Sequence, residues 1–469
     1  MWTGNEIAEA TGGKIQGNIQ DISSVSIDSR NLQAGSLFVA LKGERVDGHD
    51  YVKDALVNGA AAVLVNRIPE GINKNAPLIV VKDTYKALVY LAIAARRRSQ
   101  GKIIAVTGSV GKTSTKEAIR LAIATAGSVY ATHGNLNNHI GLPLSLANLP
   151  ADTNFGVFEL GMNHAGEISY LTKILQPDIA VITNVGAAHL EFFSSVEDIA
   201  DAKAEIMEGL GRNGTIILNR DNDFYEQLLD KAEEKGIENI LTFGEHFEAD
   251  CRLASYTLQN FGSQVEAVIK GMPITYHIGT IGYHWATTSL AALATITAAG
   301  VDLADAAAAL SNFHEPEGRG RIRIINLPQG KITLIDDCYN ASPNSMNAAL
   351  AKLAELHSNT KSTGRKIAVL GDMLELGNSS PDLHKALLAP LQNHAIDKLY
   401  AVGPHMKYLY DITPAKMQSA YTADAASITG NLTKELQPDD IVLIKGSHGS
   451  RMDIVRDAIT NKKELADAV

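Results

Sequence analysis

The chain has 469 residues, of which 45% are hydrophobic, and its formal net charge is −10. This length exceeds one ordinary hydrophobic core, so about three domains are expected. The acidic balance, without a long block of Lys or Arg, argues against a nucleic-acid-binding surface.

The cysteine content and the N-terminus indicate a cellular compartment. The two cysteines, Cys251 and Cys338, exclude a disulfide framework and a cysteine metal cage, and they favour a reducing environment. Residues 1–6 have neither the basic segment nor the apolar core of a secretory signal. No apolar run approaches the roughly 20 residues that a membrane span needs. We therefore expect a cytoplasmic protein without membrane insertion.

Residues 1–82 predict a small α/β domain. Short apolar runs of strand type are separated by turns and by one segment of helical spacing at 51–57. Two polar turns stand out, Asp28-Ser29-Arg30 and 43–50, and composition alone favours plain surface loops there. The strand-like runs lie at 25–27, 36–41, 61–65 and 78–81.

The next predicted element is a helix that Asp83-Thr84 caps and that ends in Arg96-Arg97-Arg98. Three arginines in a last turn complement the helix dipole, so we interpret them as structural rather than as an anion site. We expect this helix to bridge into a second domain, which spans 83–312.

The central feature of the sequence is an apolar strand that runs into a glycine-bracketed turn and then a helix. Glycines let successive backbone N–H groups point inward, the helix N-terminus adds partial positive charge, and Lys112 adds a full charge. The hydroxyl of Thr113 stands where a Mg²⁺ ligand belongs. Val106 replaces the first glycine of the general P-loop pattern, so this is a variant nucleotide-phosphate loop. Its residues are Thr107, Gly108, Ser109, Val110, Gly111, Lys112, Thr113 and Ser114.

Further apolar strands of this domain end in polar residues. The strand at 155–158 precedes Glu159, and the strand at 179–182 leads to His189. Such strands, alternating with helical segments, indicate a parallel sheet whose ligands gather at the carboxyl ends. We expect Glu159 and His189 at the same edge as the phosphate loop, where a buried carboxylate is paired or binds metal.

The residue pattern leaves two candidates open. A lone histidine such as His189 is more often structural than a metal ligand. Lys203 has the pattern of an ordinary solvated helix lysine. A neutral, partly buried lysine can instead react with CO₂ to form a carbamate, which is an anionic oxygen ligand for metal.

Residues 251–283 change character. They alternate in strand fashion around turns at 260–263 and 270–273, which predicts a small antiparallel lobe appended to the sheet. The Ala-rich stretch 287–299 predicts a buried helix that ends at Gly300.

The third predicted domain, 313–469, is a Rossmann-like α/β domain. No Gly-x-Gly-x-x-Gly follows its first strand, so a dinucleotide-binding role is unsupported. Its predicted strands lie at 331–335, 366–370, 398–402 and 441–444.

In these motifs the chain resembles the Mur ligase family, most closely its D-alanyl-D-alanine-adding member, and the resemblance runs nearly end to end. The loop 107–113 has the family form, which accounts for Val106. Glu159 and the segment 183–190 match the family's metal-binding Glu and His, and 202–206 matches the segment with its carbamylated lysine. The other matching segments are Asp28-Ser29-Arg30, 47–49, 134–143, Gly318-Arg319, 336–340 with Pro343 and Met346, 371–377 and 445–447.

The resemblance implies an α/β fold of three domains: a small uridine-nucleotide domain, a central P-loop ATPase domain with the antiparallel lobe, and the Rossmann-like domain. It implies a monomeric, ATP-dependent ligase that joins D-alanyl-D-alanine to UDP-N-acetylmuramoyl-tripeptide through an acyl phosphate. That reaction is the last cytoplasmic peptide addition of peptidoglycan precursor synthesis. The third residue of the peptide, diaminopimelate or lysine, stays open.

The resemblance also implies roles for individual residues, with ATP and two Mg²⁺ sites. The implied catalytic residues are Lys112, Glu159, His189 and Lys203. The implied metal ligands are Thr113, Glu159, His189 and a carbamylated Lys203. The implied nucleotide contacts are the phosphate loop together with Thr288, Arg319 and Asp337. The implied substrate contacts are Ser29, Arg30, Asn137 and Asn138.

The chain departs from the family pattern near the nucleotide. Trp285 and Thr288 stand where that member usually has asparagines. A nucleotide hydrogen bond expected at position 288 must then come from a hydroxyl or be lost. Ser342 in place of Asn is a milder change.

Three alternatives compete with this interpretation. The family member that adds the third peptide residue usually carries Asp-Asn-Pro-Arg in its last domain, and that tetrapeptide does not occur here. Folylpolyglutamate synthetase shares the ATPase core but lacks a separate uridine-nucleotide domain before the loop. A non-ligase P-loop ATPase would hydrolyse ATP without an amine acceptor.

Overall fold

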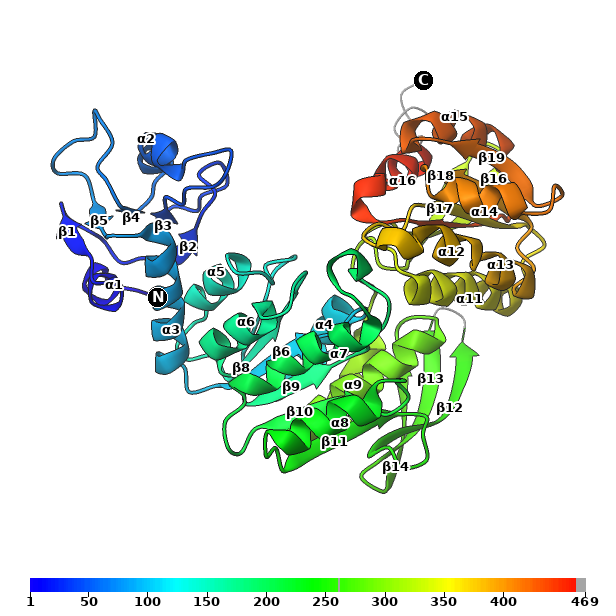
Figure 1. The fold of residues 1–469 in the computed structure, drawn as a ribbon, viewed down its shortest axis with the longest axis horizontal. Helices are drawn as coiled ribbons and strands as arrows, with labels where there is room; N and C mark the ends of the chain where they lie inside the picture. Colours follow the sequence, from blue (N-terminus) through cyan, green and yellow to red (C-terminus); the bar gives the residue numbers. More distant parts are fainter. Residues whose placement is uncertain (260–261, 461–469) are drawn as a thin grey trace.

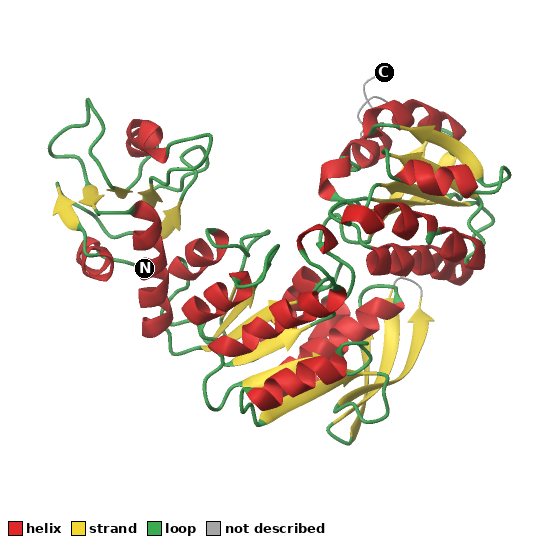
Figure 2. Cartoon of the chain, in the orientation of Figure 1, coloured by secondary structure: helices red, strands yellow, loops and turns green. Residues whose placement is uncertain are grey.

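The computed structural model describes residues 1–259 and 262–460 (Figure 1). Its strands form three sheets, and helices cover them (Figure 2). The sheets fall within the predicted segments 1–82, 83–312 and 313–469, and their mixed α/β architecture confirms the predicted fold class. The domain boundaries themselves stay predictions. The predicted turn at 260–263 lies partly outside the described residues, and 461–469 lies wholly outside them.

The first sheet has the order β1-β5-β4-β3-β2 and is parallel except for β1, which runs antiparallel to β5. Its strands and helices are β1 (Lys14–Gln16), β2 (Ser24–Ser26), β3 (Ser36–Val39), β4 (Ala62–Val65), β5 (Leu78–Val80), α1 (Gly4–Thr11) and α2 (Val52–Val57). We did not predict α1 and β1, which are short: α1 has eight residues and β1 has three.

Helix α3 (Thr84–Arg98) joins two hydrophobic cores, as predicted. Its Leu88 and Leu91 pack in the core of the first sheet, whereas its Val89 and Ala92 pack in a core of the central sheet. In Figure 1 the helix leads from the first sheet to the central one.

Two of the three arginines at the end of α3, Arg96 and Arg98, have structural contacts, as predicted. The side chain of Arg96 donates hydrogen bonds to the backbone oxygens of Leu175 and Gln176, both at 2.9 Å. The guanidinium of Arg98 lies 3.4 Å from the centre of the Trp2 ring.

The central sheet has the order β14-β13-β12-β11-β10-β9-β6-β8-β7. Its strands are β6 (Lys102–Thr107), β7 (Val129–Ala131), β8 (Phe155–Glu159), β9 (Ile179–Ile182), β10 (Thr215–Asn219), β11 (Asn239–Gly244), β12 (Cys251–Gln259), β13 (Gly262–Ile269) and β14 (Met272–Ile278). Strand β12 pairs parallel with β11 through Phe243 and Cys251, and β13 and β14 then run antiparallel. The predicted lobe is therefore a continuation of the same sheet.

Helices cover both faces of the central sheet. One core contains residues of α4 (Lys112–Ile123), α9 (Tyr283–Ala299) and α10 (Leu303–Ala309). The core on the other face contains residues of α3, α5 (Gly141–Ala147), α6 (Glu167–Leu175), α7 (Val196–Ala204) and α8 (Tyr225–Glu234). Because both faces are buried, the central strands are apolar on both sides, which is what their near-continuous hydrophobic runs predicted.

The C-terminal sheet has the order β15-β16-β20-β17-β18-β19 and is parallel except for β15, as in a Rossmann-like domain. Its elements are β15 (Arg321–Leu327), β16 (Gly330–Asp337), β17 (Lys366–Gly371), β18 (Lys398–Val402), β19 (Gln418–Thr422), β20 (Ile441–Lys445), α11 (Pro343–Thr360), α12 (Ser380–Lys385), α13 (Leu388–Asn393), α14 (Met406–Ile412), α15 (Ala425–Glu435) and α16 (Asp453–Thr460). Among the helices of the described residues, none combines the length and apolar character that crossing a bilayer requires.

Candidate active site

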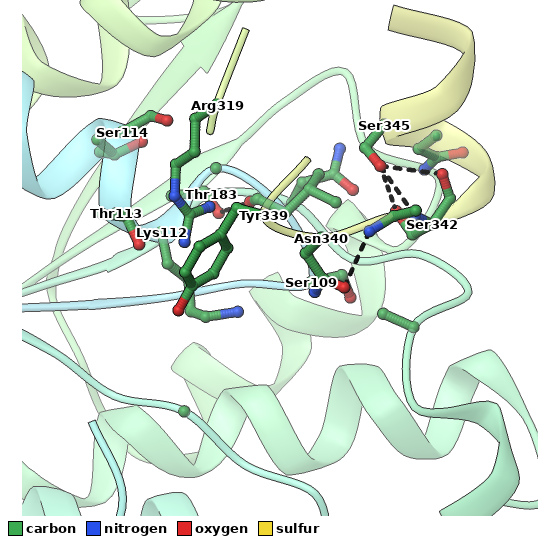
Figure 3. Close-up of a pocket in the computed structure, with 18 of the residues that line it drawn as sticks. Ser109, Lys112, Thr113, Ser114, Thr183, Arg319, Tyr339, Asn340, Ser342 and Ser345 are labelled. Carbon is green, nitrogen blue, oxygen red and sulfur yellow. Dashed lines mark hydrogen bonds between the residues drawn. The ribbon is translucent and has the colours of Figure 1, made fainter. Parts of the chain in front are cut away.

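A cavity of about 1190 Å³ lies between the central and C-terminal sheets. The phosphate loop, Glu159 and His189 line it from the central sheet, and Arg319 and Asp337 line it from the C-terminal part. Figure 3 shows the guanidinium of Arg319 directed toward the loop, beside Lys112. The fold thus brings together residues that the sequence places far apart.

The segment after β9 holds the phosphate loop in place. The Ser109 N–H donates to the Asn184 carbonyl at 2.7 Å, and the Thr183 hydroxyl donates to the Val110 carbonyl at 2.6 Å. Gly108 has φ 153°, and a Cβ there would lie 1.9 Å from the Thr183 hydroxyl oxygen. Only glycine therefore fits at 108, which explains the glycine in the motif.

The loop ends in a helix N-terminus that suits an anion. Helix α4 begins at Lys112, directly after Gly111, which has φ 85°. The Lys112 ammonium donates to the Gly108 carbonyl at 2.7 Å. Burial lowers the pKa of Lys112, Glu159 opposes this shift, and Arg319 adds to it. The free N–H groups of the first turn and the ammonium together form a phosphate cradle.

Glu159 supplies a fixed carboxylate next to the cradle. It is only 2% exposed, and its two oxygens accept hydrogen bonds from the Thr113 hydroxyl at 2.7 Å and the Asn137 amide at 2.8 Å. A Cβ at Gly161 would lie 2.9 Å from the Asn137 side chain, so glycine there lets Asn137 approach. A hydroxyl and a carboxylate held side by side are the hard oxygen donors that Mg²⁺ prefers, so these residues fit such an ion.

His189 contacts the C-terminal part of the chain. Its Nδ1 lies 2.5 Å from an oxygen of Glu375, and this hydrogen bond lowers the pKa of Glu375. Within the described residues, no group of three His, Cys, Asp or Glu side chains is placed to hold a metal ion. His189 therefore lines the cavity as expected, but its ring is paired with a carboxylate.

Lys203 is a buried amine on α7. It is 2% exposed, and its burial together with the charge of Lys112 lowers its pKa well below the usual value. Its charged neighbour is thus another cation, which further disfavours the protonated form. This burial excludes the interpretation, suggested by the residue pattern alone, that Lys203 is an ordinary solvated lysine. A neutral amine is the form that reacts with CO₂.

Residues of the C-terminal part line the cavity opposite the loop. The guanidinium of Arg319 lies 4.2 Å from the centre of the Tyr339 ring. Asp337 accepts from the Lys445 ammonium at 2.7 Å, and burial raises the pKa of Asp337. We had not predicted Tyr339 as a site residue, and only the tertiary contact identifies it.

Thr288, which stands where asparagine is usual, can form only some of the hydrogen bonds of an asparagine. Its hydroxyl donates to the His284 carbonyl one turn earlier in α9, at 2.9 Å. The proton is therefore used within the helix, and the oxygen can only accept a hydrogen bond from a ligand. Trp285 is 3% exposed and packs against Phe313, with ring centres 5.2 Å apart.

The predicted substrate residues lie in different places. Asn137 faces Glu159, whereas the Asn138 side chain accepts from the Ile140 and Gly141 N–H groups at the start of α5. Ser29 and Arg30 belong to the first sheet's domain, and the cavity does not include them. The exposed side chain of Arg30 pairs with Asp28 at 2.8 Å.

Family models match three successive parts of the chain. The Mur ligase family catalytic domain matches residues 21–96, the Mur ligase middle domain matches 106–296, and the Mur ligase glutamate ligase domain matches 320–448. These ranges contain most of the elements of the three sheets.

Individual proteins are similar over almost the whole chain. The UDP-N-acetylmuramoyl-tripeptide–D-alanyl-D-alanine ligase of Rickettsia prowazekii (strain Madrid E) is 38% identical over 97% of this chain and 99% of its own. A crystal structure of MurF from Acinetobacter baumannii has a TM-score of 0.84 at 32% identity and covers 98% of this chain and 99% of its own. MurF ligase from Thermotoga maritima in complex with ADP has a TM-score of 0.78 at 29% identity, over 94% of this chain and 98% of its own.

Proposed function

This chain belongs to the Mur ligase family, and we propose that it joins D-alanyl-D-alanine to UDP-N-acetylmuramoyl-tripeptide with ATP as the energy source. The main support is the cavity in which the phosphate loop of the central sheet faces Arg319 and Asp337 of the C-terminal part. The near full-length similarity to proteins named for this reaction agrees with it. The reaction would be the last cytoplasmic peptide addition to the peptidoglycan precursor.

The first step uses the phosphate cradle. A carboxylate oxygen of the tripeptide attacks the γ-phosphorus of ATP, the bond from that phosphorus to the β,γ-bridging oxygen breaks, and ADP leaves with the electron pair. Lys112 and the N–H groups of α4 hold the phosphates, and Arg319 approaches them from the C-terminal side. The protein contributes alignment and charge neutralisation, as in other phosphoryl transfers.

The second step forms the amide. The amine nitrogen of D-alanyl-D-alanine attacks the acyl carbon, the carbon–oxygen bond to phosphate breaks, and the nitrogen releases its proton. Water would compete with the amine for the acyl phosphate, so the site must exclude it. Closure of the central and C-terminal parts around the cavity would serve that purpose, because residues of both parts line it.

Two pairs of residues would hold two Mg²⁺ ions. Thr113 and Glu159 present oxygen donors beside the loop, where the ion would neutralise phosphate charge. His189 and Lys203 would serve a second ion, once His189 has left Glu375 and Lys203 carries a carbamate. To form this carbamate, the neutral amine attacks the carbon of CO₂, a nitrogen–carbon bond forms while one carbon–oxygen π bond opens onto its oxygen, and the nitrogen loses one proton to solvent.

We also propose roles for the remaining predicted residues. Thr288 would accept a hydrogen bond from an amino group of the nucleotide base, because its own proton is used within α9. Ser29 and Arg30, in the first domain, would contact the uridine nucleotide. Asn137 positions Glu159. One chain supplies all of these residues, which supports a monomer.

The decisive experiment measures phosphate release from ATP with UDP-N-acetylmuramoyl-tripeptide, with and without D-alanyl-D-alanine. A ligase releases phosphate in proportion to added D-alanyl-D-alanine and forms the pentapeptide product. Release that ignores D-alanyl-D-alanine would refute the proposal and favour a P-loop ATPase of another class. Single D-alanine and L-alanyl-L-alanine are the matched controls for the amine acceptor.

A further inference from the structure

The cavity extends beyond the phosphate loop toward the junction with the first domain, where the hydroxyls of Tyr85 and Tyr170 meet. Tyr170 of α6 and His139 line this end of the cavity. The Tyr170 hydroxyl lies 3.0 Å from the hydroxyl of Tyr85 on α3, and the Tyr85 hydroxyl is also 3.2 Å from the His139 carbonyl oxygen. Tyr170 is 41% exposed, so its ring is available to a ligand in the cavity.

The position of this pair follows from the fold. Helix α3 contributes to the core of the first sheet and to that of the central sheet, and Tyr85 lies in its first turn. Figure 1 shows α3, α5 and α6 side by side between the first domain and the central sheet. A molecule that extends from the first domain to the phosphate loop must therefore pass this junction.

The substrate of the proposed function has that form. Its uridine diphosphate would occupy the first domain, and its peptide carboxylate would reach the phosphate loop. The sugar ring lies between these ends in the covalent structure. It follows the diphosphate directly and precedes the tripeptide, so the N-acetylmuramoyl group is the first part of the substrate beyond the first domain and the part assigned to the junction.

We propose that Tyr170 contacts the N-acetylmuramoyl ring and that Tyr85 is the positioning residue that holds Tyr170 in place; this inference rests on the proposed function. An aromatic side chain offers an apolar face to the C–H groups of a pyranose and a hydroxyl to its polar groups. The hydrogen bond to Tyr85 restricts the Tyr170 ring, so less side-chain entropy is lost on binding. His139, edge-on to Tyr85 with ring centres 6.0 Å apart, limits the movement of Tyr85.

The test separates the parts of the substrate. We expect Tyr170→Ala to raise the KM for UDP-N-acetylmuramoyl-tripeptide about 10-fold, with the KM for ATP and for D-alanyl-D-alanine unchanged. Tyr170→Phe should raise this KM less than Tyr170→Ala does, because phenylalanine keeps the aromatic ring. Tyr85→Phe should raise the KM by about as much as Tyr170→Phe, because both variants remove the hydrogen bond between the two hydroxyls. Tyr90→Ala is the matched control. Tyr90 lies on α3, like Tyr85, and it is 51% exposed outside the cavity.

Direct binding identifies the group that Tyr170 contacts. In calorimetric titrations without ATP, Tyr170→Ala should weaken UDP-N-acetylmuramic acid but leave UDP unchanged. An equal loss for UDP, or a loss confined to the peptide-bearing substrate, would overturn the assignment to the sugar. An unchanged KM for the uridine substrate in Tyr170→Ala would also overturn it.

The outcomes distinguish this inference from the proposed function. If the unmodified protein shows no phosphate release that depends on D-alanyl-D-alanine, the proposed function fails, and the inference fails with it. If the unmodified protein is active and Tyr170→Ala behaves like Tyr90→Ala, only the inference fails. The melting temperatures of Tyr170→Ala and Tyr90→Ala should equal that of the unmodified protein, because both side chains are exposed.

Discussion

His189 and Glu375 form a hydrogen bond that joins the central and C-terminal parts across the cavity, with Nδ1 and a carboxylate oxygen 2.5 Å apart. Both residues have φ 61°, which non-glycine residues seldom adopt. The Glu191 N–H also donates to the Glu375 carbonyl at 3.1 Å. Two strained positions are thus held in mutual contact, which makes the pair a defined link between two parts of the chain.

Glu375→Ala should loosen this link. Because both side chains are partly exposed, their hydrogen bond contributes about 1 kcal/mol or less to holding the two parts together. The distribution of distances between the two parts should therefore become broader in the variant, rather than shift as a whole to longer values. Spin labels at Glu197→Cys and Asp382→Cys, whose side chains are exposed, would report this distance by electron resonance. Asp411→Ala, remote from the cavity, is the control. A distance distribution that does not change in Glu375→Ala would contradict the link.

Lys203→Ala should reduce ligase activity by about 100-fold or more, because it removes a group at the centre of a charge-stabilised reaction. Acetate or formate should restore part of the activity by replacing the carbamate. Isotope-labelled bicarbonate should give a carbamate carbon signal in the unmodified protein and none in the variant. Lys173→Ala, at an exposed lysine, should change neither readout. Full activity of Lys203→Ala would refute the carbamate.

Arg319→Ala should weaken ATP turnover and leave binding of the uridine nucleotide unchanged. The guanidinium extends toward the phosphate loop over Tyr339, whereas the first domain lies outside this contact. Steady-state kinetics for ATP and calorimetry for the uridine substrate give the two measurements. Arg321→Ala, at the exposed start of β15, is the control. An equal loss of both functions in Arg319→Ala would indicate a folding defect.

Glu315→Ala should destabilise the protein by about 3–5 kcal/mol, because it leaves Lys352 buried without its counter-charge. The two groups lie 2.5 Å apart, and Lys352 is 2% exposed. Glu317→Ala removes a pair with the partly exposed Arg323 and should cost about 0–1 kcal/mol. Thermal melting of both variants compares the two sites. Similar melting temperatures of the two variants would show that the buried pair contributes no more to stability than the exposed one.

His284 should make the stability fall as the pH decreases. Burial, with Lys352 and Lys445, lowers its pKa to about 3, compared with about 6.5 in an unfolded chain. Between these values the unfolded state binds a proton that the folded state does not bind, so the folded state loses up to about 2 kcal/mol at about pH 5. His284→Asn should therefore lose less stability than the unmodified protein between about pH 7 and pH 5. His277→Asn, exposed on β14, should behave like the unmodified protein; identical pH profiles of all three proteins would contradict the argument.

The sequence alone predicted the architecture and the nucleotide cradle, because both depend on short-range patterns. Apolar runs between helical segments specify parallel strands covered on both faces, whichever segments pair. The strand, glycine turn and Lys112-Thr113 are contiguous, so their geometry follows from local backbone rules. Glu159 was predictable for a related reason, since a polar residue at the end of a parallel strand reaches the ligand edge. The elements α1 and β1 were missed because they are short, with eight and three residues, and so short a segment contains few repeats of any pattern.

Only the tertiary structure decided which distant groups meet. The link between His189 and Glu375, the burial of Lys203 beside Lys112, and the Tyr85–Tyr170 contact each join separate elements. No local spacing encodes such contacts, since they arise when helices pack on a sheet and one part of the chain approaches another. The pKa of a lysine and the partner of a histidine depend on that packing, through desolvation and neighbouring charge. The sequence therefore identified groups such as Lys112, Glu159 and Lys203, whereas the packing determined their charge states and added neighbours that the sequence did not identify, such as Tyr339 and Tyr170.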